Sequence, residues 1–284
     1  MRSIVSPLDG VESPFGPRCR ARQEVLALLQ QFSGAAAAYS LRDLAGTDSN
    51  VVRVRRSSDN AEKDFTAKQI NDGSLVVWVG AGNDGLVSVW YDQSGSGGDA
   101  AQSVATKQPK IVDAGALVAE NGKFGLLFDG VDDYLQSADS SWPEFGPSTV
   151  EGWFLVETTS PSYQGFLGQW ESGNSQRSYI GLKGAEFRAQ ISGSTFNGSS
   201  VQPNRWYHFA VSRNSGGGIT FYLDGVLDGN ITIASGDSIL QIKTIIGDIE
   251  VYNVALNGKL SDIRIWNVEI TQQKIQSIMS YGAP

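Results

Sequence analysis

Residues 206–213 read Trp-Tyr-His-Phe-Ala-Val-Ser-Arg, and residues 219–225 read Ile-Thr-Phe-Tyr-Leu-Asp-Gly. A third stretch, Gly-Lys-Leu-Ser-Asp-Ile-Arg-Ile-Trp, follows at 258–266. Aromatic and β-branched residues are frequent in these stretches, and the side chains can be divided between two faces at a period of two, as in strands. The glycine-rich segment between the first two stretches favours a turn. We therefore predict an antiparallel all-β domain.

In order and spacing, these stretches resemble the C-terminal half of a laminin-G-like, or concanavalin A-like, jelly roll. In that family the aromatic-rich strand pairs with the Phe-Tyr-Leu-Asp-Gly strand, and the third stretch closes the sandwich before a short helix. The resemblance covers roughly residues 124–281, and the segment 127–135, Leu-Phe-Asp-Gly-Val-Asp-Asp-Tyr-Leu, is similar to the opening of such domains. It implies an antiparallel jelly-roll β-sandwich. The resemblance indicates no particular function, because lectins, glycanases and adhesion modules share this architecture.

Short runs of β-branched and aromatic residues at 38–42, 51–56, 75–79 and 86–91 predict further strands upstream. Residues 52–65 (Val-Arg-Val-Arg-Arg-Ser-Ser-Asp-Asn-Ala-Glu-Lys-Asp-Phe) and 87–100 (Val-Ser-Val-Trp-Tyr-Asp-Gln-Ser-Gly-Ser-Gly-Gly-Asp-Ala) resemble the catalytic-domain region of fungal-type α-L-arabinofuranosidase B. Similar strings occur in bacteriophage virion proteins. This resemblance covers about residues 36–130. We expect residues 35–284 to form one sandwich, because no linker-like tract divides them.

Residues 1–34 differ in composition from the rest. Pro7, Pro14 and Pro17 exclude a long helix or a central strand, so the first 20 residues should form an extended arm. Residues 22–32 carry apolar side chains near helical spacing and predict a short helix that ends before Gly34. This helix either caps an edge of the sandwich or docks, together with the arm, onto a neighbouring protein. A last short helix is expected at 271–280, capped by Thr271.

Composition excludes several classes of function. The chain has 284 residues and a net charge of −8, which argues against nucleic acid as a partner because phosphate binding needs a basic surface. No segment has the apolar length that spans a bilayer. The first residues lack the apolar core of a secretory signal, so we expect no export by that route. Cys19 is the single cysteine, which excludes an intrachain disulfide and a thiolate metal cluster.

No catalytic residue can be assigned from the sequence. Glycoside hydrolysis usually needs two carboxylates, but no acid here lies on a motif matching the acidic pair of the arabinofuranosidase-like family, and the cysteines of that family are absent. Glu151 lies at a predicted strand start and could face a concave sheet. His208 is the only histidine, and the strand period predicts a packed residue on the same face as Trp206.

Several aspartates have two interpretations. Asp129, Asp132, Asp133 and Asp262 could stabilise turns, as aspartate often does. They could also supply oxygen ligands to calcium, which laminin-G-like sandwiches often hold at a sheet edge. We favour the turn interpretation and assign no cofactor, with calcium as the open alternative.

Carbohydrate binding is the best-supported ligand interaction. Between residues 158 and 200, aromatic and planar polar side chains alternate with glycine, serine and asparagine, a composition typical of recognition loops. We predict Tyr163, Trp170 and Arg177 as carbohydrate-binding residues. Tyr179, Phe196 and Asn197 lie in the same stretch, and each aromatic residue could instead belong to the core.

Two functions remain. The first is a non-enzymatic structural or adhesion protein of a bacteriophage virion, such as a tail fibre, baseplate or capsid-surface component. It would contact other virion proteins through residues 1–34, form a homo-oligomer and bind host-surface polysaccharide. The alternative is a glycoside hydrolase of the α-L-arabinofuranosidase type.

Overall fold

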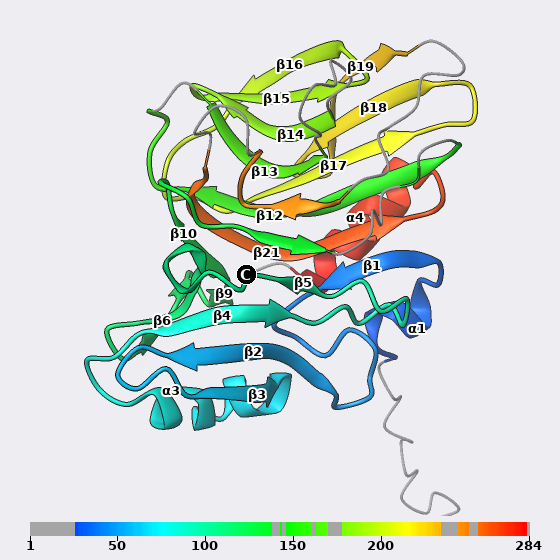
Figure 1. Ribbon diagram of the computed structural model, residues 1–284. Coiled ribbons are helices and arrows are strands. Elements are labelled where there is room, and N and C mark those ends of the chain that lie inside the picture. Colours follow the sequence, from blue (N-terminus) through cyan, green and yellow to red (C-terminus); the bar gives the residue numbers. More distant parts are fainter. Residues whose placement is uncertain are drawn as a thin grey trace, which may run out of the picture.

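The computed structural model describes residues 26–137, 143, 146–160, 163–169, 178–233, 243–249 and 255–282. These residues form an antiparallel β-sandwich followed by a short C-terminal helix, so the predicted fold class is confirmed (Figure 1). The predicted extended arm lies outside the described residues. Of the helix expected at 22–32, residues 26–32 are described, and the helical part of them is the single turn α1, Leu28–Gln31.

The first half of the chain contains most of the short helices. Its elements are α1 (Leu28–Gln31), β1 (Ala35–Tyr39), β2 (Asn50–Arg56), β3 (Glu62–Thr66), α2 (Ala67–Asn71), α3 (Ser74–Val79), β4 (Gly85–Trp90), β5 (Ala100–Ala101), η1 (Ala105–Lys107), β6 (Lys110–Asp113), β7 (Ala116–Leu117), β8 (Ala119–Glu120), β9 (Lys123–Phe124), β10 (Leu126–Asp129) and β11 (Leu135–Ser137).

The second half contains the longer strands. Its elements are β12 (Ser148–Val156), β13 (Tyr163–Gln169), β14 (Ser178–Lys183), β15 (Glu186–Ile191), β16 (Ser194–Ser200), β17 (Tyr207–Arg213), β18 (Gly218–Leu223), β19 (Val226–Thr232), β20 (Ile245–Ile246), β21 (Asn257–Trp266) and α4 (Gln272–Gly282).

Two layers of strands meet at β4. One layer runs β16-β15-β14-β13-β20-β11-β5 and the other runs β19-β18-β17-β12-β21-β10-β6, and both β5 and β6 pair with β4. Beyond β4 lie β2 and β3, which form the lower part of Figure 1. Strand β1 pairs with the C-terminal part of β21. The early strands are therefore hydrogen-bonded into the same sheet system as the late ones.

The main core lies between the two layers and is rich in phenylalanine. Phe154 of β12 stacks on Phe166 of β13 with ring centroids 4.2 Å apart, and Phe209 of β17 packs against both. Such aromatic pairs stabilise a core beyond the apolar area that they bury. The strand alternation predicted for 206–213 is confirmed, because Tyr207 and Phe209 belong to this core while Trp206 lies in a separate cluster.

A second apolar layer covers the outer side of β12, β17 and β21. Ile275 and Ile278 of α4 pack there against Trp266, together with Ala38 of β1 and Leu28 of α1. The helix predicted at 271–280 is thus present as α4, and its role is to cover this side of the sheet. Polar residues on that side of β12 are consequently buried beneath α4 and its neighbours.

The strand predicted at 75–79 is wrong, because this run forms α3. Leu75 and Val79, four residues apart, are buried, whereas Val77 is 82% exposed. A five-residue apolar run fits either structure by composition. Two neighbouring features favour the helix. Gly73 before it has a left-handed backbone (φ 82°), and the preceding α2 begins with a Thr66–Gln69 capping box.

Across the part of the chain that the structure describes, no helix combines the length and the apolar character needed to traverse a bilayer.

Candidate functional site

The outward surface of β13–β16 carries the clearest grouping of recognition side chains. In β15, Phe187, Ala189 and Ile191 point into the core, so the alternating positions Arg188 and Gln190 face outward. The same alternation places Phe196 of β16 in the core and leaves its neighbour Asn197 exposed.

Arg188 is the centre of this surface. Its Nε donates to the Tyr179 hydroxyl at 2.8 Å, and its Nη1 donates to Asn197 Oδ1 at 2.6 Å. Its guanidinium carbon lies 5.7 Å from the centroid of the Tyr163 ring, within cation–π distance. We call this grouping of Tyr163, Tyr179, Arg188 and Asn197 the Arg188 face.

The position of these groups follows from strand register. Arg188 pairs with Gly181 of β14 on one side and with Asn197 of β16 on the other. Directly paired residues point to the same side of an antiparallel sheet, so Asn197 is placed beside the guanidinium. Gly181 has a different role, since a Cβ atom there would overlap the Gln164 carbonyl of β13.

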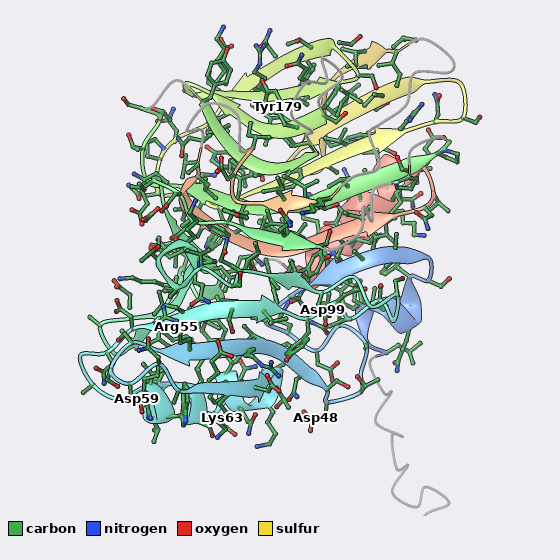
Figure 2. All side chains as sticks on the ribbon, viewed as in Figure 1. Asp48, Arg55, Asp59, Lys63, Asp99 and Tyr179 are labelled. Atoms are coloured by element: carbon green, nitrogen blue, oxygen red, sulfur yellow. The ribbon has the colours of Figure 1, made fainter. Side chains whose placement is uncertain are left out.

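An apolar patch supports the aromatic part of the face. Tyr179 is 6% exposed and packs with Ile249, and Tyr163 contacts the same cluster. Ile249 lies over Gly165 and Gly168 of β13, where a Cβ atom would overlap its side chain. The glycines thus let Ile249 approach the sheet closely. In Figure 2, Tyr179 lies in the upper layer, far from the lower strands that carry Arg55 and Lys63.

The sequence prediction recovers this face in part. Tyr163 belongs to it and is half-buried, and Tyr179 and Asn197 join it. Phe196 does not, because its ring stacks on Phe221 with centroids 4.0 Å apart. Trp170 and Arg177 lie outside the described residues.

Arg188 itself was missed by sequence reasoning. The signal was present in the alternation Glu-Phe-Arg-Ala-Gln-Ile at 186–191, which places Arg188 on the solvent side of a strand. That signal does not say which neighbours the side chain meets, because those come from the pairing of β14, β15 and β16.

Asp129, Asp132 and Asp133 converge at the turn after β10. Each offers a carboxylate oxygen, and these oxygens all lie within 4.8 Å of one another. The turn interpretation also holds, since Asp129 Oδ1 accepts from Val131 N at 2.8 Å and Asp133 Oδ2 accepts from Asp129 N at 3.1 Å. Burial, together with the charge of Asp129, raises the pKa of Asp133 to about 7.

This carboxylate set fits a hard divalent cation. Such ions bind several carboxylate oxygens and backbone carbonyls, and a positive charge would relieve the repulsion that raises the pKa of Asp133. One cation nearby is Lys107, whose Nζ lies 3.7 Å from Asp132 Oδ2, and the charge of Lys110 also acts on Asp133.

Asp262 does not belong to this set, so it is not placed to share a calcium ion with the other three aspartates. It is 1% exposed on β21, where it accepts hydrogen bonds from Ser40 and Arg42 and lies 3.4 Å from Lys123 Nζ. Burial alone would raise its pKa, but the charges of Arg42 and Lys123 hold that pKa well below its usual range. The surrounding cations already neutralise this carboxylate.

Glu151 does not face an open concave surface, contrary to the expectation from sequence. It is 1% exposed beneath the outer layer of α4 and β1, where Arg264 donates to both of its carboxylate oxygens. His208 Nε2 lies 2.9 Å from Glu151 Oε2, which confirms the packed histidine. Burial opposes ionisation of Glu151, but Arg264 and His208 hold its pKa below the usual value.

A small pocket of about 140 Å³ lies beside Ser261 of β21, the residue before Asp262. Arg42, Lys123 and Ser261 line it, together with Asn71 and Tyr281. Lys123 is held between the Trp153 ring at 4.6 Å and the Asp262 carboxylate, and burial lowers the pKa of its amine. These contacts anchor the β8–β9 hairpin to the sheet.

A family comparison agrees with this architecture. Residues 129–276, more than half of the chain, match the family model Laminin_G_3, described as the concanavalin A-like lectin/glucanases superfamily. The chain belongs to this superfamily. No curated protein matches the sequence.

Solved structures share the fold at low sequence identity. A GH54 α-L-arabinofuranosidase superposes with a TM-score of 0.64 at 11% identity, covering 89% of this chain and 63% of that protein. The serotype D botulinum neurotoxin ligand-binding domain in complex with N-acetylneuraminic acid superposes with a TM-score of 0.51 at 13% identity, covering 82% of this chain and 51% of that one. The chain therefore spans less than two thirds of the length of these proteins. At such identities the likeness establishes the fold alone.

Proposed function

We propose that this chain is a non-enzymatic adhesion protein that binds polysaccharide through the Arg188 face. The observation that carries the proposal is the convergence of a half-buried tyrosine ring, a fixed guanidinium and an exposed amide on the outward side of one sheet. Aromatic rings and planar polar groups of this kind give contact area and hydrogen bonds at low entropic cost.

Binding to immobilised bacterial surface polysaccharides tests the proposal. Tyr163→Ala and Asn197→Ala should each weaken binding by about tenfold, the loss of a moderate interaction hot spot. Arg205→Gln is the matched control, because Arg205 also lies over a tyrosine ring, that of Tyr207 at 4.5 Å, but outside the face. The polymer length should stay unchanged after incubation. Failure of the wild-type chain to bind any polysaccharide would overturn the proposal.

We place this adhesion protein on a bacteriophage particle, as a tail or capsid-surface component. The support is the resemblance of residues 52–65 and 87–100 to strings in virion proteins. A homo-oligomer on a particle would present many weak sites at once and raise avidity by orders of magnitude.

Attachment to other virion proteins is assigned to residues 1–34. Deletion of residues 1–20 should leave the sandwich folded, as judged by circular dichroism, and abolish incorporation into particles, as judged by immunogold electron microscopy. Normal incorporation of the shortened chain would contradict this role.

Glycoside hydrolysis of the arabinofuranosidase type is the second candidate function. The observation in its favour is Asp133, whose pKa of about 7 beside Asp129 suits a general acid at neutral pH. Release of nitrophenol from 4-nitrophenyl α-L-arabinofuranoside, abolished by Asp133→Asn, would replace the adhesion proposal with this one.

A further inference from the structure

The charge of Arg188 is held in place without being neutralised. Both acceptors that fix it, the Tyr179 hydroxyl and the Asn197 amide oxygen, are neutral groups. The guanidinium groups of Arg42, Arg53, Arg56, Arg205 and Arg264 each contact an aspartate or glutamate. Arg55 is also held by neutral acceptors, but all three of its nitrogens donate, to Gln108, Asn60 and the Ala105 carbonyl. Within the described residues, no carboxylate lies within ion-pair distance of Arg188.

The remaining hydrogen-bonding capacity of Arg188 is large. A guanidinium has five N–H donors, and the two contacts above use one at Nε and one at Nη1. The other donors belong to a half-buried side chain on the outward side of the sheet. A planar guanidinium fork matches a carboxylate better than it matches a hydroxyl, and such charge-assisted bonds are about twice as strong as neutral ones.

The charges of the outward strand positions favour an anion as well. Lys183 at the end of β14 and Glu186 at the start of β15 are paired across the turn and offset each other. Arg188 is then the remaining charged residue at the outward positions of β14 and β15, on a chain whose net charge is −8. A polyanion is repelled by the molecule as a whole, so its binding would require this local site.

We infer that the Arg188 face selects acidic polysaccharides, with Arg188 binding a carboxylate of the sugar polymer and Tyr163 contacting a neighbouring sugar ring. This inference rests on the proposed polysaccharide binding and adds the chemical class of the ligand. The shared chemistry is a planar anionic group on a sugar, as in uronic acids.

The experiment compares polygalacturonate with the same polymer after chemical reduction of its carboxyl groups, using biolayer interferometry on the full chain. The wild-type chain should bind the acidic polymer about tenfold more tightly than the reduced one, the value of one additional charge-assisted contact. Dextran sulfate and dextran form a second pair, which separates a requirement for carboxylate from a requirement for any anion.

Variants assign the preference to Arg188. Arg188→Gln should remove the preference, so that the acidic and the reduced polymer bind equally, whereas Arg188→Lys keeps the charge without the fork and should retain part of the preference. Arg205→Gln, which removes an arginine already paired with Asp224, should keep the full preference. Melting temperatures of all variants establish that they are folded.

The outcomes separate the two proposals. Equal binding of acidic and reduced polymers by the wild-type chain, or an unchanged preference in Arg188→Gln, would overturn the acidic-ligand inference and leave polysaccharide binding intact. A preference for dextran sulfate with none for polygalacturonate would overturn the carboxylate assignment. If the wild-type chain binds neither these four polymers nor the immobilised bacterial surface polysaccharides, the proposed function itself is overturned.

Discussion

At the scale of single residues, burial decides which charged groups serve the fold and which can serve a ligand. Glu151 and Arg264 are both fully enclosed and mutually paired, so removing one leaves the other charged in a dry environment. Glu151→Gln should lower the free energy of unfolding by about 3–5 kcal/mol in urea titrations. Glu157→Gln, which breaks a pair with Lys259 in which the Glu157 side chain is 42% exposed, should change it by at most about 1 kcal/mol. Equal effects of the two substitutions would show that the buried pair is not needed for stability.

Asp133 gives a pH dependence of the opposite sign to that of a paired carboxylate. Its folded-state pKa of about 7 exceeds the ordinary value of 3.8, so the folded protein binds this proton more tightly than the unfolded chain does. Stability should therefore fall as the pH rises from about 4 to about 7, by on the order of 2–4 kcal/mol. Urea titrations in the presence of a chelator measure this slope.

Asp133→Asn should flatten that slope, because it removes the titrating group, while Asp113→Asn, on the exposed end of β6, serves as the control. Calcium at about 1 mM should raise the stability of the wild-type chain at pH 7 and not that of Asp133→Asn, since a ligand bound by the folded state alone stabilises it. An unchanged slope in Asp133→Asn would contradict the assignment.

At the scale of elements, the sequence predicts strands well where they are long and alternate, as in β17, β18 and β21. It fails for residues 75–79, because five apolar residues carry no reliable period. It finds Tyr163 by composition but cannot find its partner Arg188, because that contact depends on the register between β14, β15 and β16. Composition and alternation predict that a side chain is exposed, but the pairing of the strands determines which side chains are neighbours.

The two interpretations of residues 75–79 make different predictions for substitution. In a strand, Leu75, Val77 and Val79 would share one face, whereas in α3 Val77 is exposed and Val79 is buried. Val77→Lys should therefore change the free energy of unfolding by less than about 0.5 kcal/mol. Val79→Lys should destabilise by about 3 kcal/mol or more, because it buries an unpaired charge. Similar losses in both variants would indicate a shared face.

At the scale of the whole molecule, the pairing pattern predicts a single cooperative unit from residue 35 onward. The link is physical: β10 pairs with both β21 and β6, and β5 joins β11 to β4. A cut near residue 125 would expose these strand edges and the apolar core residues on both sides of the break. Neither fragment could satisfy its backbone hydrogen bonds alone, so neither should be stable.

We therefore expect unfolding in urea to give coincident transitions by tryptophan fluorescence and by far-ultraviolet circular dichroism, the signature of a two-state process. Tryptophans report on both parts, since Trp90 lies in β4 and Trp153 in β12. Limited proteolysis should yield one large core that retains residues on both sides of position 125. Two separate transitions, or two stable fragments divided near that position, would show instead that the early strands form a domain of their own and that the Arg188 face belongs to the later one alone.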